Sequence, residues 1–396
     1  MYDFDTVIDR STTDCVKYSH DAYRRHFGGA DVLPFWVADM DFKCAPAIVD
    51  AVVARAKEGV YGYPETGTQN ESFARWVQRR FGWEIETDWV VNTSGVVPAL
   101  NAAVRSFTSP GDSVIIQRPV YYPFTNAIVN NGRHALVNEL IVGEKQFSID
   151  FNDLEQKAAL PNTTLMLLCS PHNPGGRVWT ADELCRIMRI CREHNVLVVC
   201  DEIHADLIMP GFKHTVSAAL DEETADNIVV CMAPSKTFNL AGMHFANIVI
   251  PNSELRRRFK RTLEQNGEGK PGSFAMAAAI AAYDKSEDWL EECLAYLAAN
   301  VEFVHEYLGE RIPGISFFEQ QGTYLVWMDF RALGLTDEEL EQIIFHEALV
   351  GLDGGSWFGE GGSGFMRMNV ACPRSVLTEG LSRIVHAFAA RGFCEK

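Results

Sequence analysis

Five short, almost uninterrupted apolar runs in the middle of the chain constrain its fold more than any other feature. They cover residues 114–117, 165–169, 197–200, 228–231 and 247–250. Runs without polar alternation are typical of strands in a parallel sheet that is covered on both faces. A helical pattern lies between two of them, over 181–193, and begins with a T-x-x-E capping box at Thr180 and Glu183. This order of strand, helix and strand predicts an α/β fold.

A change of pattern after residue 282 predicts a second structural unit. It consists of a long helix, two strands and a last helix, over residues 289–308, 324–330, 365–370 and 376–390. A chain of 396 residues is also too long for one small core. We therefore expect a large α/β domain over residues 46–282, and a smaller α+β domain formed by residues 1–45 and 283–396.

The charge and the cysteines exclude several classes of protein. The formal net charge is −18, which argues against binding to nucleic acid or to an anionic membrane, since both require a basic surface. No apolar run is long enough to span a membrane, and the N-terminus lacks the pattern of a signal peptide. The ten cysteines form no CxxC pair and no regular framework. These features predict a cytoplasmic protein without disulfides, and we expect no metal site.

Four residues that could bind a ligand or take part in a reaction stand next to the predicted strands and helices. Asn173, Asp201 and Lys236 each follow one of the apolar runs, and Gly95 precedes a helical pattern. Each one alone has an ordinary explanation as a cap, a turn residue or a solvated side chain. Because open α/β sheets bind ligands at the carboxyl ends of their strands, the four together predict a binding site at one edge of the sheet.

Several longer motifs give the chain a resemblance to a known family over nearly its whole length. They are FDTVIDRSTTDCVKY, FWVADMDF, YGYPETG, PVYYPF, SPHNPGG, DEIHADL, SKTFNLAG and GGSWFG. The chain resembles fold type I enzymes that use pyridoxal 5′-phosphate (PLP), in the aminotransferase class I/II group. Within that group it is similar to the MalY/PatB-type cystathionine β-lyases. The resemblance implies an aspartate-aminotransferase-like fold, a mostly parallel sheet flanked by helices, and PLP as the cofactor.

The chemistry of PLP accounts for the residue types at the matching positions. Lys236 matches the catalytic lysine whose amine bonds to the cofactor aldehyde. Asp201 matches the carboxylate that keeps the pyridine nitrogen protonated, and Asn173 matches a donor to the phenolate oxygen. The phosphate is expected at the helix N-terminus formed by Ser94, Gly95 and Val96.

Further positions resemble the parts of the family site that bind substrate and join subunits. Tyr121 matches an aromatic ring that stacks on the cofactor and, with Asn173, contacts the substrate. Arg367 matches the arginine that grips the substrate α-carboxylate with its planar fork. Tyr61 matches a tyrosine that reaches the phosphate of the neighbouring subunit, which implies a homodimer with shared sites. Ser235 is expected to contact the phosphate.

The sequence departs from the broad family at three positions. His204 stands where class I aminotransferases usually have a tyrosine; it can donate to the phenolate oxygen, but it also titrates. His244 stands where the broad family has a phosphate-binding arginine. The phosphate must then rely on backbone amides, Ser235 and Tyr61. Ala233 replaces a serine found in many relatives. The two histidines fit the lyase subgroup.

These features predict a PLP-dependent carbon–sulfur β-lyase. It would cleave L-cystathionine or related cysteine S-conjugates to pyruvate, ammonia and a thiol, as in methionine biosynthesis. An aminotransferase is the alternative, because both reactions share the removal of the α-proton. A regulator that keeps PLP only as a ligand is a third possibility, but regulators of this fold usually carry a fused DNA-binding domain, and this chain is acidic. The sequence leaves the choice among S-conjugates open.

Overall fold

An eight-stranded sheet forms the centre of the molecule in the computed structural model, which describes residues 1–394. In spatial order its strands are β2 (Val90–Thr93), β9 (Ala246–Val249), β8 (Ile228–Met232), β7 (Leu197–Asp201), β6 (Thr163–Cys169), β3 (Ser113–Arg118), β4 (His134–Val142) and β5 (Phe147–Ile149). The five strands β8, β7, β6, β3 and β4 pair in parallel, whereas β9 and β5 pair antiparallel with their neighbours. The five apolar runs are therefore confirmed as strands of one mostly parallel sheet.

Helices cover both faces of this sheet. Successive residues of β6 point to opposite sides: Leu165 and Leu167 belong to one core cluster, and Met166 and Leu168 to the other. The first cluster is completed by α4 (Val96–Phe107), α5 (Pro123–Val129) and α10 (Ser253–Gln265). The second is completed by α3 (Thr68–Phe81), α7 (Ala181–Glu193) and α11 (Ser273–Lys285). Both faces are thus apolar, which explains why the strands show no polar alternation.

The predicted capping box fixes the start of α7. The Glu183 amide donates to the Thr180 hydroxyl at 3.2 Å, and the Thr180 amide donates back to the Glu183 carboxylate at 2.8 Å. Two of the free N–H groups at the helix start are satisfied in this way. The helix therefore begins at the residue that the sequence predicts.

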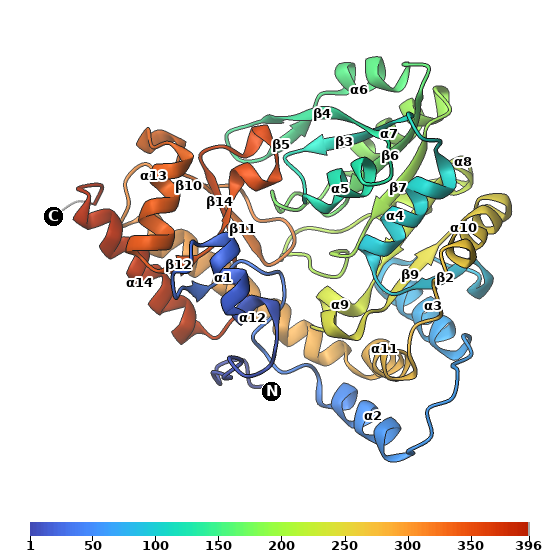
Figure 1. The fold of residues 1–396 in the computed structure, drawn as a ribbon, viewed down its shortest axis with the longest axis horizontal. Coiled ribbons are helices and arrows are strands. Elements are labelled where there is room, and N and C mark those ends of the chain that lie inside the picture. Colours follow the sequence, from blue (N-terminus) through green and yellow to red (C-terminus); the bar gives the residue numbers. More distant parts are fainter. Residues whose placement is uncertain (395–396) are drawn as a thin grey trace.

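A second, antiparallel sheet forms after residue 282. Its order is β10 (Ser316–Phe317), β11 (Leu325–Asp329), β14 (Phe365–Asn369) and β13 (Asp353–Gly354). The predicted long helix is α12 (Glu287–Gly309), and the predicted last helix is α14 (Arg374–Ala390). In the N-terminal segment, β1 (Leu33–Pro34) pairs in parallel with β12 (Val350–Gly351). Figure 1 shows the N-terminal α1 (His20–His26) beside these C-terminal elements. The domain boundaries at residues 45 and 282 stay a prediction.

Five further α-helices occur within residues 1–394. They are α2 (Pro46–Lys57), α6 (Phe151–Ala158), α8 (Glu222–Asp226), α9 (Pro234–Thr237) and α13 (Asp337–Glu341). None of the helices within residues 1–394 combines the length and the apolar content that crossing a bilayer requires.

Candidate active site

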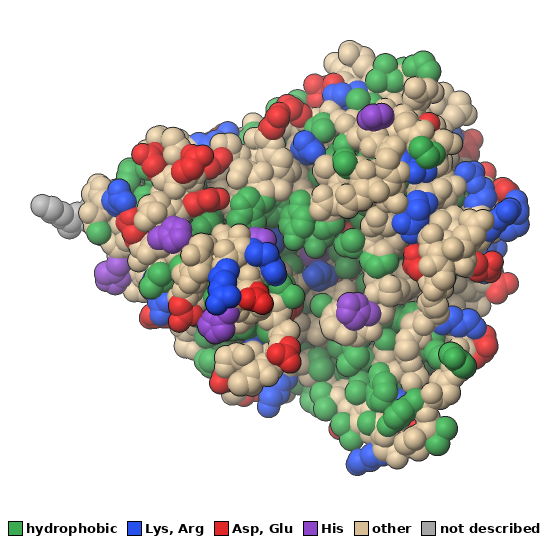
Figure 2. All heavy atoms as spheres, in the orientation of Figure 1, with side chains coloured by type: hydrophobic (Ala, Val, Ile, Leu, Met, Phe, Trp, Pro, Cys, Tyr) green, Lys and Arg blue, Asp and Glu red, His purple; other side chains and the backbone are tan. Residues whose placement is uncertain are grey.

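A cavity of about 500 Å³ lies where the carboxyl ends of β6, β7 and β8 meet the N-terminal segment and the second sheet. All of the sequence-predicted site residues except Tyr61 line it; they are Ser94, Gly95, Val96, Tyr121, Asn173, Asp201, His204, Ser235, Lys236 and Arg367. Figure 2 shows a hollow between the two parts of the molecule, bordered by hydrophobic side chains. Residues more than 270 positions apart in the chain thus meet in one space.

Lys236 projects from the short helix α9, which follows β8 directly. Its amine donates to the Ala38 carbonyl, with 2.6 Å between nitrogen and oxygen. Removal of the ammonium from water lowers the pKa of Lys236 to about 8, the positive charge of Arg367 acts in the same direction, and the carboxylates of Asp39 and Asp201 oppose it. A lysine with a lowered pKa has a larger fraction of free amine near neutrality, as a nucleophile requires.

Asp201 is the last residue of β7, and only 5% of it is exposed. Its carboxylate accepts a hydrogen bond from the Ile203 amide at 3.1 Å, and no cation within residues 1–394 forms an ion pair with it. Burial raises the pKa of Asp201 to about 7, although the Ile203 amide and the ammonium of Lys236 oppose the shift. This carboxyl therefore lacks a charge partner, and a protonated ring nitrogen in the cavity would supply one.

His204 presents a second unsatisfied group to the same space. Its Nδ1 is buried and has no hydrogen-bond partner among the described residues. Burial lowers the pKa of His204 to about 3, and the positive charges of Lys236 and Arg367 lower it further. The ring is therefore neutral, with one N–H available as a donor. A neutral donor suits an oxygen on a ligand that carries part of a negative charge.

The start of α4 forms the opposite wall of the cavity. Gly95 is its N-cap residue and has φ 154°, and no side chain caps the helix. The first backbone N–H groups of this 12-residue helix therefore remain available beside the cavity, in a backbone conformation that favours glycine. Uncapped amides at a helix N-terminus bind anions such as phosphate. Ser235 and His244 line the same cavity.

Arg367 and Asn173 are held together at the other end of the cavity. Arg367 lies on β14 and is 3% exposed. Its Nη1 donates to the Asn173 Oδ1 at 2.9 Å. Because a guanidinium only donates, the amide oxygen of Asn173 faces the arginine, and its Nδ2 is free to donate to a ligand. The backbone amide of Tyr121 donates to the Asn173 backbone carbonyl at 3.2 Å. Tyr121 also lines the cavity.

The sequence analysis assigned no site residue to the segment 36–42, yet the backbone of this segment contacts Lys236 and Arg367. The Ala38 carbonyl accepts from Lys236, and the Trp36 carbonyl accepts from Arg367 Nη2 at 2.9 Å. A backbone carbonyl carries no side-chain signature. The FWVADMDF motif marked the segment as family-like, but it could not indicate this contact.

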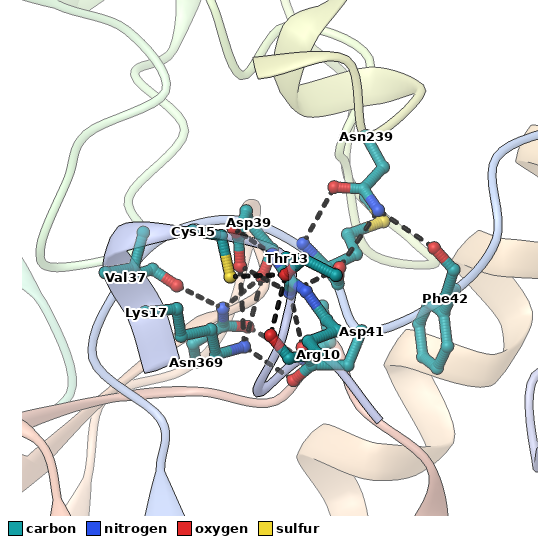
Figure 3. A network of polar contacts seen from close by, with 12 residues as sticks. Arg10, Thr13, Cys15, Lys17, Val37, Asp39, Asp41, Phe42, Asn239 and Asn369 are labelled. Atoms are coloured by element: carbon teal, nitrogen blue, oxygen red, sulfur yellow. Dashed lines mark hydrogen bonds and ion pairs between the residues drawn. The ribbon is translucent and has the colours of Figure 1, made fainter. Parts of the chain in front are cut away.

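A largely buried cluster of four charges holds this segment in place (Figure 3). Arg10 donates to Asp39 at 2.7 Å and to Asp41 at 2.5 Å. Lys17, which is 1% exposed, donates to the second oxygen of Asp41 at 2.6 Å. Two cations thus neutralise two carboxylates, as buried charges require.

The side-chain amides of two asparagines donate hydrogen bonds to the backbone of the same segment (Figure 3). Asn369, two residues after Arg367, donates to the carbonyls of Val37 and Asp39, both at 2.6 Å. Asn239, three residues after Lys236, donates to the carbonyls of residues 40 and 42, both at 2.9 Å. The loops that carry the two basic side chains are therefore tied to the segment that contacts them.

Tyr61 lies away from the cavity within its own chain. It is 55% exposed, its hydroxyl donates to the Ala56 carbonyl at 2.6 Å, and its ring packs against Phe274 at 5.3 Å between centroids. Further exposed apolar side chains lie on α2 and just after it; they are Val49, Val53, Val60 and Tyr63. Figure 2 shows hydrophobic side chains gathered in the part of the molecule where Figure 1 places α2. A role of Tyr61 in a neighbouring subunit stays a prediction.

Comparisons with known proteins find similar sequences and structures over most of the chain. A family model for aminotransferase class I and II matches residues 30–384. Cystathionine beta-lyase PatB of Bacillus subtilis is 42% identical, over 98% of this chain and 100% of that protein. Protein MalY of Escherichia coli is 33% identical, over 98% of this chain and 100% of that protein. A PLP-bound putative aminotransferase from Clostridium difficile has a TM-score of 0.95 and 40% identity, covering 98% of this chain and 100% of that one.

Proposed function

The chain belongs to the aminotransferase class I and II family, and from this premise we propose that it is a PLP-dependent carbon–sulfur β-lyase. The reaction takes L-cystathionine or a related cysteine S-conjugate and water to pyruvate, ammonia and a thiol. The observation that carries the proposal is the convergence of Lys236, Asp201 and Arg367 on one cavity. Similarity to a cystathionine beta-lyase over the full length of that enzyme supports the same reaction.

The cavity fits PLP group by group. The uncapped start of α4 suits the phosphate, and the amine of Lys236 suits the aldehyde. Asp201 lacks a cationic partner, which the pyridine nitrogen would supply. The free Nδ2 of Asn173 and the unpartnered ring of His204 suit the phenolate oxygen. When bound, PLP supplies an electron sink for the electron pair left at the substrate α-carbon.

Lys236 is the general base of this proposal. The pKa of its amine is about 8 in the cavity, so a larger fraction of the amine is unprotonated near neutrality than for an ordinary lysine. The unprotonated amine can take a proton from the α-carbon and later return it. In the cofactor-free chain, the hydrogen bond to the Ala38 carbonyl holds this amine beside the cavity. Once the α-proton is on Lys236, the bond between the β-carbon and sulfur can break and the thiolate leaves.

Asp201 and Arg367 orient the reacting groups. The Asp201 carboxylate holds a proton at the pyridine nitrogen, which preserves the electron sink. Arg367 binds the substrate carboxylate and thereby points the α-proton toward Lys236. Tyr121 lines the wall between them, where its ring can cover the face of the cofactor.

The lining of the cavity favours a cysteine conjugate over aspartate. Within the described chain, Lys236 and Arg367 are the only lysine and arginine that line it. One would bind the cofactor and the other the α-carboxylate, so no lysine or arginine of this chain's lining remains to pair with the side-chain carboxylate of aspartate. The second carboxylate of cystathionine differs, because the ammonium group beside it on the substrate balances its charge. Apolar side chains including Val16, Trp36 and Val37 suit a thioether instead.

We also propose that the enzyme works as a homodimer in the cytoplasm. The exposed apolar side chains around α2 and Tyr61 provide a surface that a second copy would cover. In that arrangement Tyr61 contacts the phosphate in the site of the partner subunit. With cystathionine as substrate, the thiol released would be homocysteine, the precursor of methionine.

A product assay on purified, PLP-loaded protein tests the proposed reaction. Cystathionine should yield pyruvate, ammonia and a free thiol in equal amounts. An aminotransferase would instead form a 2-oxo acid that keeps the sulfur, without ammonia or thiol. Absence of thiol would contradict the lyase.

A further inference from the structure

A buried carboxylate faces Arg367 inside the cavity. Asp353 on β13 is the register partner of Arg367 on β14, so that the two side chains lie on the same face of the antiparallel pair. Both residues are 3% exposed, and both line the cavity. Arg367 Nη2 donates to the Asp353 carboxylate, which receives no other hydrogen bond from residues 1–394.

The hydrogen bonds of Arg367 show which of its nitrogens remain for a substrate. Nη1 has one partner in Asn173, whereas Nη2 has both Asp353 and the Trp36 carbonyl. Nε is buried without a partner. A carboxylate binds in a fork either to Nη1 and Nη2 or to Nε and Nη2. Both forks include Nη2, the nitrogen that Asp353 already uses.

We infer that Asp353 is an internal counter-ion of Arg367, and that a substrate carboxylate must displace it to bind. The inference rests on the proposed function, because it takes Arg367 as the group that receives the substrate carboxylate. Asp353 is thus a residue that sets substrate affinity: it keeps the buried guanidinium neutralised in the empty site and weakens the binding of carboxylates. The affinity of an analogue that lacks the carboxylate should not depend on Asp353.

The strand that carries Asp353 has little room to move away from Arg367. A Cβ on Gly355, two residues on, would lie 2.0 Å from the Gly362 carbonyl oxygen, so the chain is already in close contact there. Displacement must therefore come from rotation or protonation of the side chain. Burial raises the pKa of Asp353 to about 6, against the effect of Arg367. The other titratable groups that line the cavity are Tyr121, Tyr122, Cys169, Asp201, His204, Lys236, His244 and Arg367.

The test compares two ligands that differ only at the carboxylate, L-alanine and L-alaninamide. Neither has a β-leaving group, and their binding to PLP-loaded enzyme is followed by the cofactor's absorption. Asp353→Asn should tighten L-alanine about tenfold, the change expected when a competing charge is removed, and leave L-alaninamide unchanged. Asp353→Ser is a second neutral variant. Asp329→Asn is the matched control, since Asp329 lies in the same sheet, pairs with Arg331 and does not line the cavity.

A pH series adds an independent readout. In the natural enzyme, the preference for L-alanine over L-alaninamide should fall as pH rises through about 6, because Asp353 becomes charged and competes. In Asp353→Asn the preference should stay constant. Unchanged or weaker L-alanine binding in both neutral variants would overturn the inference and leave Asp353 as a positioning group for Arg367. Because this is a binding measurement, a negative product assay with cystathionine would not alter its outcome.

Discussion

The amine of Lys236 donates a hydrogen bond to the backbone carbonyl of Ala38, although the two residues are 198 positions apart in the chain. The same carbonyl accepts from the Tyr324 hydroxyl at 3.0 Å. The segment that carries it is held by Arg10 and Lys17 through Asp39 and Asp41. The position of the reactive lysine therefore depends on an ion cluster near the N-terminus as well as on the central sheet.

Removing Lys17 should weaken both the fold and the reaction. Lys17→Met leaves Asp41 buried with one partner fewer, and breaking a buried pair costs about 3–5 kcal/mol. We expect a lower free energy of unfolding in a denaturant titration and a lower kcat at saturating substrate, since the Ala38 carbonyl loses its support. The control is Arg24→Met, because Arg24 and Asp21 form an exposed pair worth about 0–1 kcal/mol. Equal effects of the two substitutions would contradict this role of the cluster.

Replacing Asp201 should reduce turnover far more than cofactor binding. Asp201→Asn keeps the shape of the side chain but cannot hold a proton at the pyridine nitrogen through its charge. We expect kcat to fall by about two orders of magnitude or more, while borohydride reduction still attaches the cofactor to Lys236. Near-normal turnover in this variant, measured beside Asp329→Asn, would remove Asp201 from the catalytic residues.

The stability of the cofactor-free protein should depend on Asp201 and on pH. The pKa of Asp201 is raised to about 7 in the folded protein, so the folded state keeps a proton that the unfolded state loses above about pH 4. The free energy of unfolding should therefore fall between about pH 4 and pH 7, by up to about 4 kcal/mol. Asp201→Asn cannot ionise, so it should match the natural protein near pH 4 and exceed it above pH 7. Parallel pH profiles for the two proteins would show that Asp201 is not desolvated.

Local sequence patterns were sufficient to predict the central sheet, because β6, β7 and β8 are apolar on both faces and α7 carries its own capping box. Asn173, Asp201 and Lys236 were predictable for a related reason: each follows such a strand. Ala38 and Asp353 were not predictable from the sequence. Ala38 contacts Lys236 through its backbone carbonyl, and Asp353 contacts Arg367 because the two residues are paired across neighbouring strands. Such contacts depend on tertiary packing, which no local pattern encodes. Tyr61 came only from resemblance, and its own chain does not bring it to the cavity.

Subunit mixing tests whether Tyr61 acts in the neighbouring site. Lys236→Ala and Tyr61→Ala chains, each inactive alone, should together recover about a quarter of the natural activity. This follows because half of the dimers are mixed and each has one intact site. Lys236→Ala mixed with Asp201→Asn should recover nothing, since both residues belong to the same chain's site. Equal outcomes for the two mixtures would place Tyr61 outside the partner's site.

The most direct test of the proposed reaction is the yield of pyruvate from cystathionine with enzyme alone. A β-lyase returns to its starting state with water as the only second reactant, so pyruvate should exceed active sites many-fold without any 2-oxo acid. An aminotransferase stops after one half-reaction and resumes only when a 2-oxo acid is added. Slow transamination beside rapid pyruvate release is compatible with a lyase, because both reactions begin with the same proton transfer to Lys236. A single stoichiometric burst on cystathionine, followed by arrest that 2-oxoglutarate relieves, would contradict the account.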